Sequence, residues 1–116
     1  MTNFYAGQVI IAGDRYHAAS GTYTGGRPHL VMAEPENGQL YVVEWSHTPQ
    51  GNWSTDELPS RHHDQSYLVT RHFRSGKWLG RWIDERQAQS YRRQLSAGAR
   101  TEALQYVWGE YDRAHG

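Results

Sequence analysis

The sequence predicts an α+β domain: a small, strongly bent antiparallel β-barrel of about five strands, followed by two C-terminal helices. Segments with strand patterns all precede residue 84, and segments with helical spacing follow it. Asn37-Gly38 separates two apolar runs and favours a hairpin turn, because both residues tolerate a positive φ angle. A chain of 116 residues has room for one modest core, so we expect a single domain over residues 1–116.

The first predicted strand covers residues 8–12, which are rich in β-branched side chains. Residues 13–26 hold four glycines and predict a flexible loop, longer than the usual connection of about 4–6 residues. Residues 29–34 and 39–45 form the two strands of the hairpin.

A second predicted loop, rich in proline, glycine and polar residues, covers residues 46–65. Residues 66–72 resume a strand pattern, and a turn at residues 74–76 leads into a further strand over residues 77–83. Alternation along this last strand places Trp78, Gly80 and Trp82 on one face and Leu79, Arg81 and Ile83 on the other.

Asp84 is the predicted N-cap of a first helix running from about Glu85 to Leu95, with Gly98 as its stop signal. Thr101 would cap a second helix. The apolar stripe of this second helix consists of Leu104, Val107, Trp108 and Tyr111. We expect the stripe to pack on the domain's own sheet, with a dimer or partner interface as the alternative.

Several classes of protein are disfavoured. The chain has no cysteine, which excludes a disulfide scaffold and a thiolate metal site and fits the cytoplasm. Neither a signal peptide nor an apolar run long enough to span a membrane is visible. His62 and His63 would point in opposite directions on an extended chain, so we expect no metal site, and no motif indicates a cofactor.

Charge is unevenly distributed although the net charge is zero. Residues 1–60 carry a net charge of −4, residues 61–93 carry +5 and the remainder carries −1. Seven of the eight cations in the basic segment are arginine, whose planar fork suits phosphate or carboxylate. Interleaved aromatic residues could stack on bases, so the segment predicts an RNA-binding strip unless it is an ordinary solvated face. Its proposed contacts are Arg61, Arg71, Arg74, Lys77, Trp78 and Arg81.

The hairpin brings its two strand ends together. With a turn at Asn37-Gly38, residues near 28 face residues near 47, so Arg27 should approach Ser46, His47 and Thr48. If the first strand pairs with the hairpin, we expect the glycine-rich loop carrying Asp14 and His17 to lie over the same edge.

These features in their order resemble the MazF/PemK (Kid) toxins of type II toxin–antitoxin systems. The resemblance covers most of residues 7–96 and rests on the ordered segments rather than on any single motif. The matching segments are Gly7-Gln8-Val9-Ile10-Ile11, the glycine-rich loop, Arg27-Pro28, the hairpin, Ser46-His47-Thr48-Pro49, His63-Asp64-Gln65 and Arg74-x-Gly76-Lys77-x-Leu79. Gln8 and His62 depart from the family pattern, which usually has an acidic residue and an arginine at these two positions.

The resemblance implies an SH3-like barrel and a sequence-selective, metal-independent endoribonuclease that cleaves single-stranded RNA through the 2′-OH. It also implies a homodimer in the cytoplasm, with a cognate antitoxin protein as a partner. Arg27 and Thr48 are the implied catalytic residues. Asp64 is the favoured base or orienting group, and His62 and His17 are alternatives because imidazole titrates near neutral pH.

Two other functions remain open at this point. One is a non-catalytic small-barrel module that binds protein or nucleic acid, as the related CcdB toxins bind gyrase. The other is an interaction domain unrelated to toxins, with Trp78 and Trp82 on its contact surface. For each predicted site residue the plainer interpretation is structural: a strand-end arginine for Arg27, turn chemistry for Thr48 and a surface carboxylate for Asp64.

Overall fold

The computed structural model describes residues 3–13, 15–17, 22–24, 26–46, 53–58, 66–68 and 80–115. Its elements in chain order are β1 (Val9–Ala12), β2 (Arg15–His17), β3 (Thr22–Thr24), β4 (Arg27–Val31), β5 (Gln39–Ser46), β6 (Ser54–Thr55), β7 (Ser66–Leu68), β8 (Arg81–Asp84), the 3₁₀ helix η2 (Glu85–Gln87), β9 (Ala88–Ser90) and α1 (Ala97–His115). Strands precede the α-helix, as predicted.

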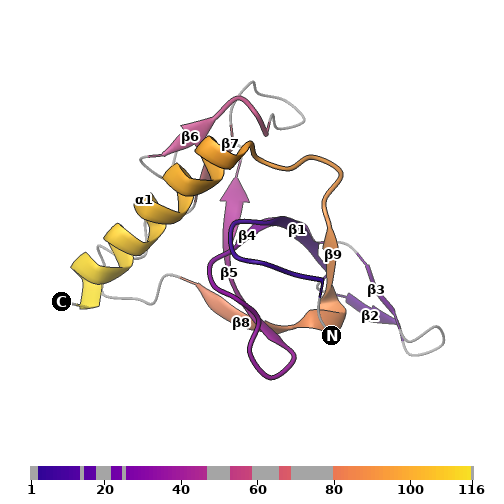
Figure 1. The fold of residues 1–116 in the computed structure, drawn as a ribbon. Helices are drawn as coiled ribbons and strands as arrows, with labels where there is room; N and C mark the ends of the chain where they lie inside the picture. Colours follow the sequence, from indigo (N-terminus) through magenta and orange to yellow (C-terminus); the bar gives the residue numbers. More distant parts are fainter. Residues whose placement is uncertain are drawn as a thin grey trace.

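Five strands form an open antiparallel sheet in the order β8-β5-β4-β1-β9 (Figure 1). Short strand β7 pairs with the C-terminal end of β5, and β6 pairs with β7. The predicted closed barrel is wrong: within the described residues, β8 and β9 each pair with a neighbour on one side and not with each other. The three residues of η2 join these two outer strands along the chain.

The predicted hairpin is confirmed. Asn37 and Gly38 have φ angles of 53° and 75°, and Glu36 bridges to Gln39 around them. Beyond the turn the register shifts, because Met32 pairs through its N–H with the carbonyl of Tyr41. Between the Met32–Tyr41 hydrogen bond and the Glu36–Gln39 bridge lie three residues on the β4 side and one residue on the β5 side. This unequal number forms a bulge.

Both faces of the sheet carry apolar side chains. The face covered by α1 packs the core residues Val9, Leu30, Met32, Val43, Trp45, Leu58, Leu95, Ala103 and Val107. The opposite face gathers a second cluster of Ile10, Ala12, Val31, Leu40, Val42, Ile83 and Ala88. We call these the helix face and the second face. The predicted helical stripe packs on the sheet, and Trp108 Nε1 donates to Met32 O at 2.9 Å.

The predicted helix over Glu85 to Leu95 is wrong. Asp84 does act as an N-cap, but its capping box with Gln87 closes a single 3₁₀ turn. The chain then enters β9 and pairs with β1. Farther on, the Gln94 side chain donates to Val9 O at 2.7 Å and accepts from Val9 N at 2.8 Å. Long-range pairing with β1 therefore overrides the local helical spacing.

Within the described residues there is one α-helix, and it begins earlier than predicted. Ser96 Oγ accepts from Ala99 N at 3.3 Å, and the Glu57 carboxylate accepts from both the backbone and the hydroxyl of Ser96. Gly98 and Thr101 lie inside α1 instead of marking a stop and a cap. No helix in the described part of the chain has the length and apolar character needed to cross a membrane.

The predicted flexible loop of residues 13–26 contains a second small sheet. β2 and β3 pair as an antiparallel hairpin that projects from the main sheet on the side away from α1 (Figure 1). Gly26 ends the segment with a φ angle of 90°. A Cβ atom on Gly26 would overlap the carbonyl of Ala12, so this position requires glycine.

We expect Gly26→Ala to lower the free energy of unfolding by more than about 1 kcal/mol, because it adds both a steric overlap and an unfavourable φ angle. Gly109→Ala is the matched control: it lies within α1, and an added Cβ has open space. This control should raise stability by roughly 0.5–1 kcal/mol. Denaturant titration of both variants measures the difference, and equal stability of Gly26→Ala and wild type would contradict the packing of Gly26 against β1.

Candidate functional site

The structure describes a minority of the predicted site residues. It gives the side chains of Arg27 and Arg81 and places His17 in β2. Outside the described residues lie Thr48, Asp64, His62, Arg61, Arg71, Arg74, Lys77 and Trp78. The candidate site is therefore built from Arg27 and Arg81 and from the residues that contact them.

Arg27 and Arg81 belong to one polar cluster on the second face. His29 is paired with Ile10 on one side and with Glu44 on the other, and Arg81 is paired with Val42. Alternation then places Arg27, His29, Glu44 and Arg81 on the same face as the second apolar core. We call these four residues the polar cluster.

His29 is the buried centre of the polar cluster and is 5% exposed. Its Nδ1 lies 2.7 Å from the carbonyl oxygen of Arg27. Because a carbonyl only accepts, we assign the ring proton to Nδ1, which leaves Nε2 with a lone pair. The Nη2 atom of Arg81 lies 3.5 Å from Nε2 and can donate toward it.

The surroundings of His29 favour its neutral form. Burial lowers the pKa of His29 below its ordinary value, and the positive charges of Arg81 and Arg27 act in the same direction. The hydrogen bond to the Arg27 carbonyl and the negative charge of Glu44 oppose this shift without reversing it. The imidazole is therefore uncharged near pH 7.

Arg27 is held at the edge of the polar cluster by Glu44. Its Nη1 donates to Glu44 Oε1 at 2.7 Å, and the Arg27 side chain is 67% exposed. An exposed pair of this kind contributes about 0–1 kcal/mol to stability. The bond uses one of five N–H donors on the guanidinium, so the group retains donors for a phosphate oxygen.

The neighbours of Arg27 agree in part with those that the sequence predicts. Ala12 pairs with Arg27, so the segment that follows β1 begins beside this arginine, as predicted. The hairpin register differs from the predicted one, in which residues near 28 face residues near 47, because the bulge shifts the pairing. When the pairing of His29 with Glu44 is extended by two residues along each strand, Arg27 lies opposite Ser46. Residues His47 and Thr48 lie outside the described residues.

The predicted basic and aromatic strip divides between two faces in β8. Arg81 is paired with Val42 on the second face, whereas Trp82 is paired with Tyr41 on the helix face. Trp82 is 50% exposed and its ring centroid lies 5.0 Å from that of Tyr41. Arg81 and Trp82 therefore belong to different surfaces.

Sequence reasoning missed His29 and Glu44. The signal was present, because His29 follows Arg27 by two residues and Glu44 follows Val42 by two, which puts each on the second face. Gln8, which stands where the toxin pattern has an acidic residue, has a local structural role: its Oε1 accepts from Tyr5 N at 3.2 Å, and the residue is 5% exposed.

Metal ligands do not gather in the described part of the chain: it holds no group of three or more His, Cys, Asp or Glu side chains that could bind a metal ion. Comparison of the chain with protein-family models, curated proteins and solved structures finds no match. The chemical interpretation therefore rests on the polar cluster itself.

The free energy of unfolding should fall as the pH drops below about 6.5, because unfolded His29 binds a proton before folded His29 does. The loss should continue until the pH passes the lowered folded pKa and then level off for this residue. His29→Gln removes the titrating group and should flatten this part of the stability profile. Urea titrations between pH 5 and 8 measure both, and identical pH slopes for the two proteins would contradict the buried neutral state.

Proposed function

We propose that the protein is a metal-independent endoribonuclease that cleaves single-stranded RNA, with the scissile phosphodiester bound at the polar cluster. The observation that carries the proposal is the contact of His29 with both arginines: its Nδ1 lies 2.7 Å from the backbone carbonyl of Arg27, and its Nε2 lies 3.5 Å from the Arg81 guanidinium. Arg27 begins β4, the first strand of the hairpin, and Arg81 begins β8, within the basic segment that predicts RNA binding. Both lie on one face of the sheet, where a single phosphate could accept from both.

Cleavage of RNA through its 2′-OH without a metal ion requires two proton-transfer groups and donors for the phosphate oxygens. The 2′-oxygen attacks phosphorus and the bond to the 5′-oxygen breaks, which leaves a 2′,3′-cyclic phosphate and a free 5′-hydroxyl. One group must take the 2′-OH proton and another must give a proton to the 5′-oxygen. Two guanidinium groups can stabilise the negative charge that gathers on the phosphate oxygens.

The proton-transfer roles follow from the resemblance to MazF/PemK toxins. Thr48 would act beside Arg27, and Asp64 would serve as base or orienting group, with His62 and His17 as alternatives. Arg61, Arg71, Arg74, Lys77 and Trp78 would bind the flanking RNA. The same resemblance supports a homodimer in the cytoplasm whose activity a cognate antitoxin protein blocks.

We expect the purified protein to cleave a mixed-sequence single-stranded RNA in EDTA. Arg27→Ala and Arg81→Ala should each slow cleavage, Arg27→Ala by about 100-fold or more, because each removes donors from the developing negative charge. Gel analysis of the products measures the rates, and the fragments should carry cyclic phosphate ends.

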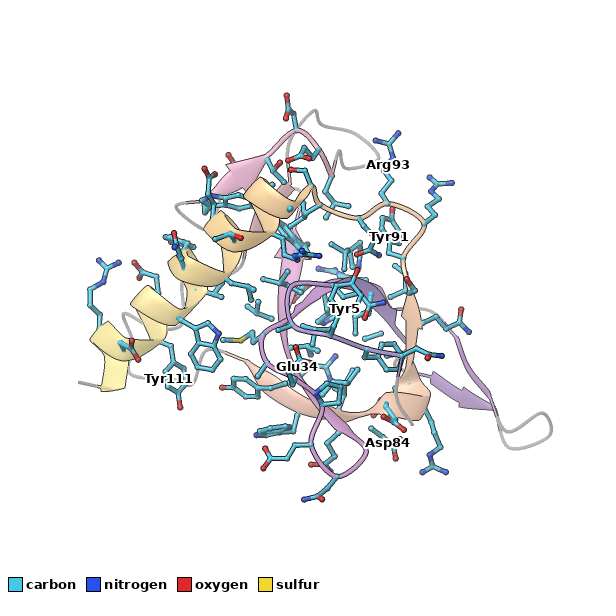
Figure 2. All side chains as sticks on the ribbon, in the orientation of Figure 1. Tyr5, Glu34, Asp84, Tyr91, Arg93 and Tyr111 are labelled. Atoms are coloured by element: carbon cyan, nitrogen blue, oxygen red, sulfur yellow. The ribbon has the colours of Figure 1, made fainter. Side chains whose placement is uncertain are left out.

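Arg93→Ala is the matched control, because Arg93 ends the basic segment without being one of its proposed RNA contacts. It removes the same charge from an exposed arginine on the segment between β9 and α1 (Figure 2). This variant should cleave within about twofold of wild type, since solvent screens a single exposed charge. Full activity of Arg27→Ala, or cleavage that EDTA abolishes, would contradict the proposal.

A second candidate is a non-catalytic module that binds RNA or protein. The ion pair between Arg27 and Glu44 and the burial of His29 favour it, because such a cluster can hold an anion without moving a proton. Binding of single-stranded RNA by the wild-type protein with no cleavage product would support the binding module. Fragments with cyclic phosphate ends would support the ribonuclease.

A further inference from the structure

We infer that His29 is a positioning residue, whose neutral imidazole holds the Arg81 guanidinium beside Arg27 so that both arginines bind the same phosphodiester. The inference rests on the proposed function for the identity of the anion. The contact between His29 and Arg81 itself is independent of that identity and can be tested without RNA.

The sheet geometry gives His29 this role. Arg81 lies on the outer strand β8, and β5 separates it from β4. Its guanidinium nevertheless lies 3.5 Å from the imidazole on β4, so the side chain extends over β5 toward His29, two residues from Arg27 along β4. An exposed arginine has many rotamers, and an acceptor at a fixed place favours the rotamers that point toward the polar cluster.

The imidazole is itself fixed. Its Nδ1–H donates to the Arg27 carbonyl at 2.7 Å, and burial between neighbouring strands leaves the ring 5% exposed. One histidine thus contacts the backbone of the first arginine and the side chain of the second. The separation of 3.5 Å is long for a hydrogen bond, so the imidazole biases the Arg81 position without locking it.

Protonation of His29 would break its contact with the Arg81 guanidinium. Among the described residues, the charged groups that face His29 are Arg27 from β4, Glu44 from β5 and Arg81 from β8, while β1 contributes Ile10. A proton on Nε2 would convert the acceptor for Arg81 into a donor and place a third positive charge beside the two arginines. Arg81 would then turn away from Arg27.

A positioning role for His29 and a purely electrostatic role predict opposite pH dependence of anion binding. If His29 only added charge, acid would strengthen the binding of an anion. If His29 positions Arg81, acid weakens binding, because the two arginines separate. A phosphodiester keeps its single negative charge between pH 5 and 8, so the RNA itself does not titrate in this range.

The test measures the affinity for a mixed-sequence, 2′-O-methylated single-stranded oligonucleotide, which cannot be cleaved through its 2′ position. His29→Gln can place a non-titrating acceptor toward Arg81, whereas His29→Asn keeps a donor for the Arg27 carbonyl and is too short to reach Arg81. As the pH falls through the folded-state pKa of His29, which an NMR titration of the same protein locates, wild type should lose about fivefold in affinity relative to His29→Gln. Its affinity should not rise relative to this variant.

Arg81→Ala provides the second comparison. It should weaken binding several-fold in wild type and by less than twofold in His29→Asn, because Arg81 is already misplaced there. A gain in wild-type affinity with acid relative to His29→Gln, or an equal effect of Arg81→Ala in both backgrounds, would overturn the positioning role.

NMR of the free protein separates this inference from the proposed function. The ring ¹⁵N shifts of His29 should report a proton on Nδ1, and Arg81→Ala should raise the His29 pKa by removing a nearby positive charge. Absence of RNA binding together with both NMR results would refute the proposed function and leave the contact intact. A proton on Nε2, or an unchanged pKa in Arg81→Ala, would refute the contact.

Discussion

The structure depends on β5, an eight-residue strand that is covered on both faces and paired along both edges. One edge pairs with β4, while the other pairs with β8 along its N-terminal half and with β7 at its C-terminal end. Leu40 and Val42 contribute to the second face, and Val43 and Trp45 contribute to the helix face. A strand with two buried faces needs cover on each side, which α1 provides on one side and the curled sheet provides on the other (Figure 1).

The polar cluster is a consequence of this arrangement. Along the second face the apolar side chains of β4 and β5 give way to His29 and Glu44, and the flanking arginines come from the start of β4 and from β8. The imidazole must be buried there, so it needs a partner for each nitrogen. The Arg27 carbonyl and the Arg81 guanidinium meet this need, which links the packing of the sheet to the placement of two cations.

Local patterns predicted the features that local chemistry determines. Asn37-Gly38 formed its turn and Asp84 capped a helical turn, because each requires only neighbouring residues. The stripe containing Val107 packed on the sheet, because its helical spacing gathers apolar side chains on one face that must be buried. The helix predicted after Asp84 failed because Gln94 bonds to Val9, which is 85 positions away. The polar cluster was found in part, because Arg27 and Arg81 were identified and His29 was not. Strand alternation could have placed His29 on the face of Arg27, but its contact with Arg81 joins two strands that the sequence does not show to be close.

The most direct test of the central claim, that Arg27 and Arg81 act on one phosphodiester, is a double-mutant cycle on RNA affinity. Arg27→Ala, Arg81→Ala and the double variant are compared with wild type for a non-cleavable single-stranded RNA at fixed salt. The account predicts a coupling energy of at least about 0.5 kcal/mol, as for groups that share one partner. Additive effects within about 0.3 kcal/mol would show that the two arginines bind separate parts of the RNA and would contradict the account.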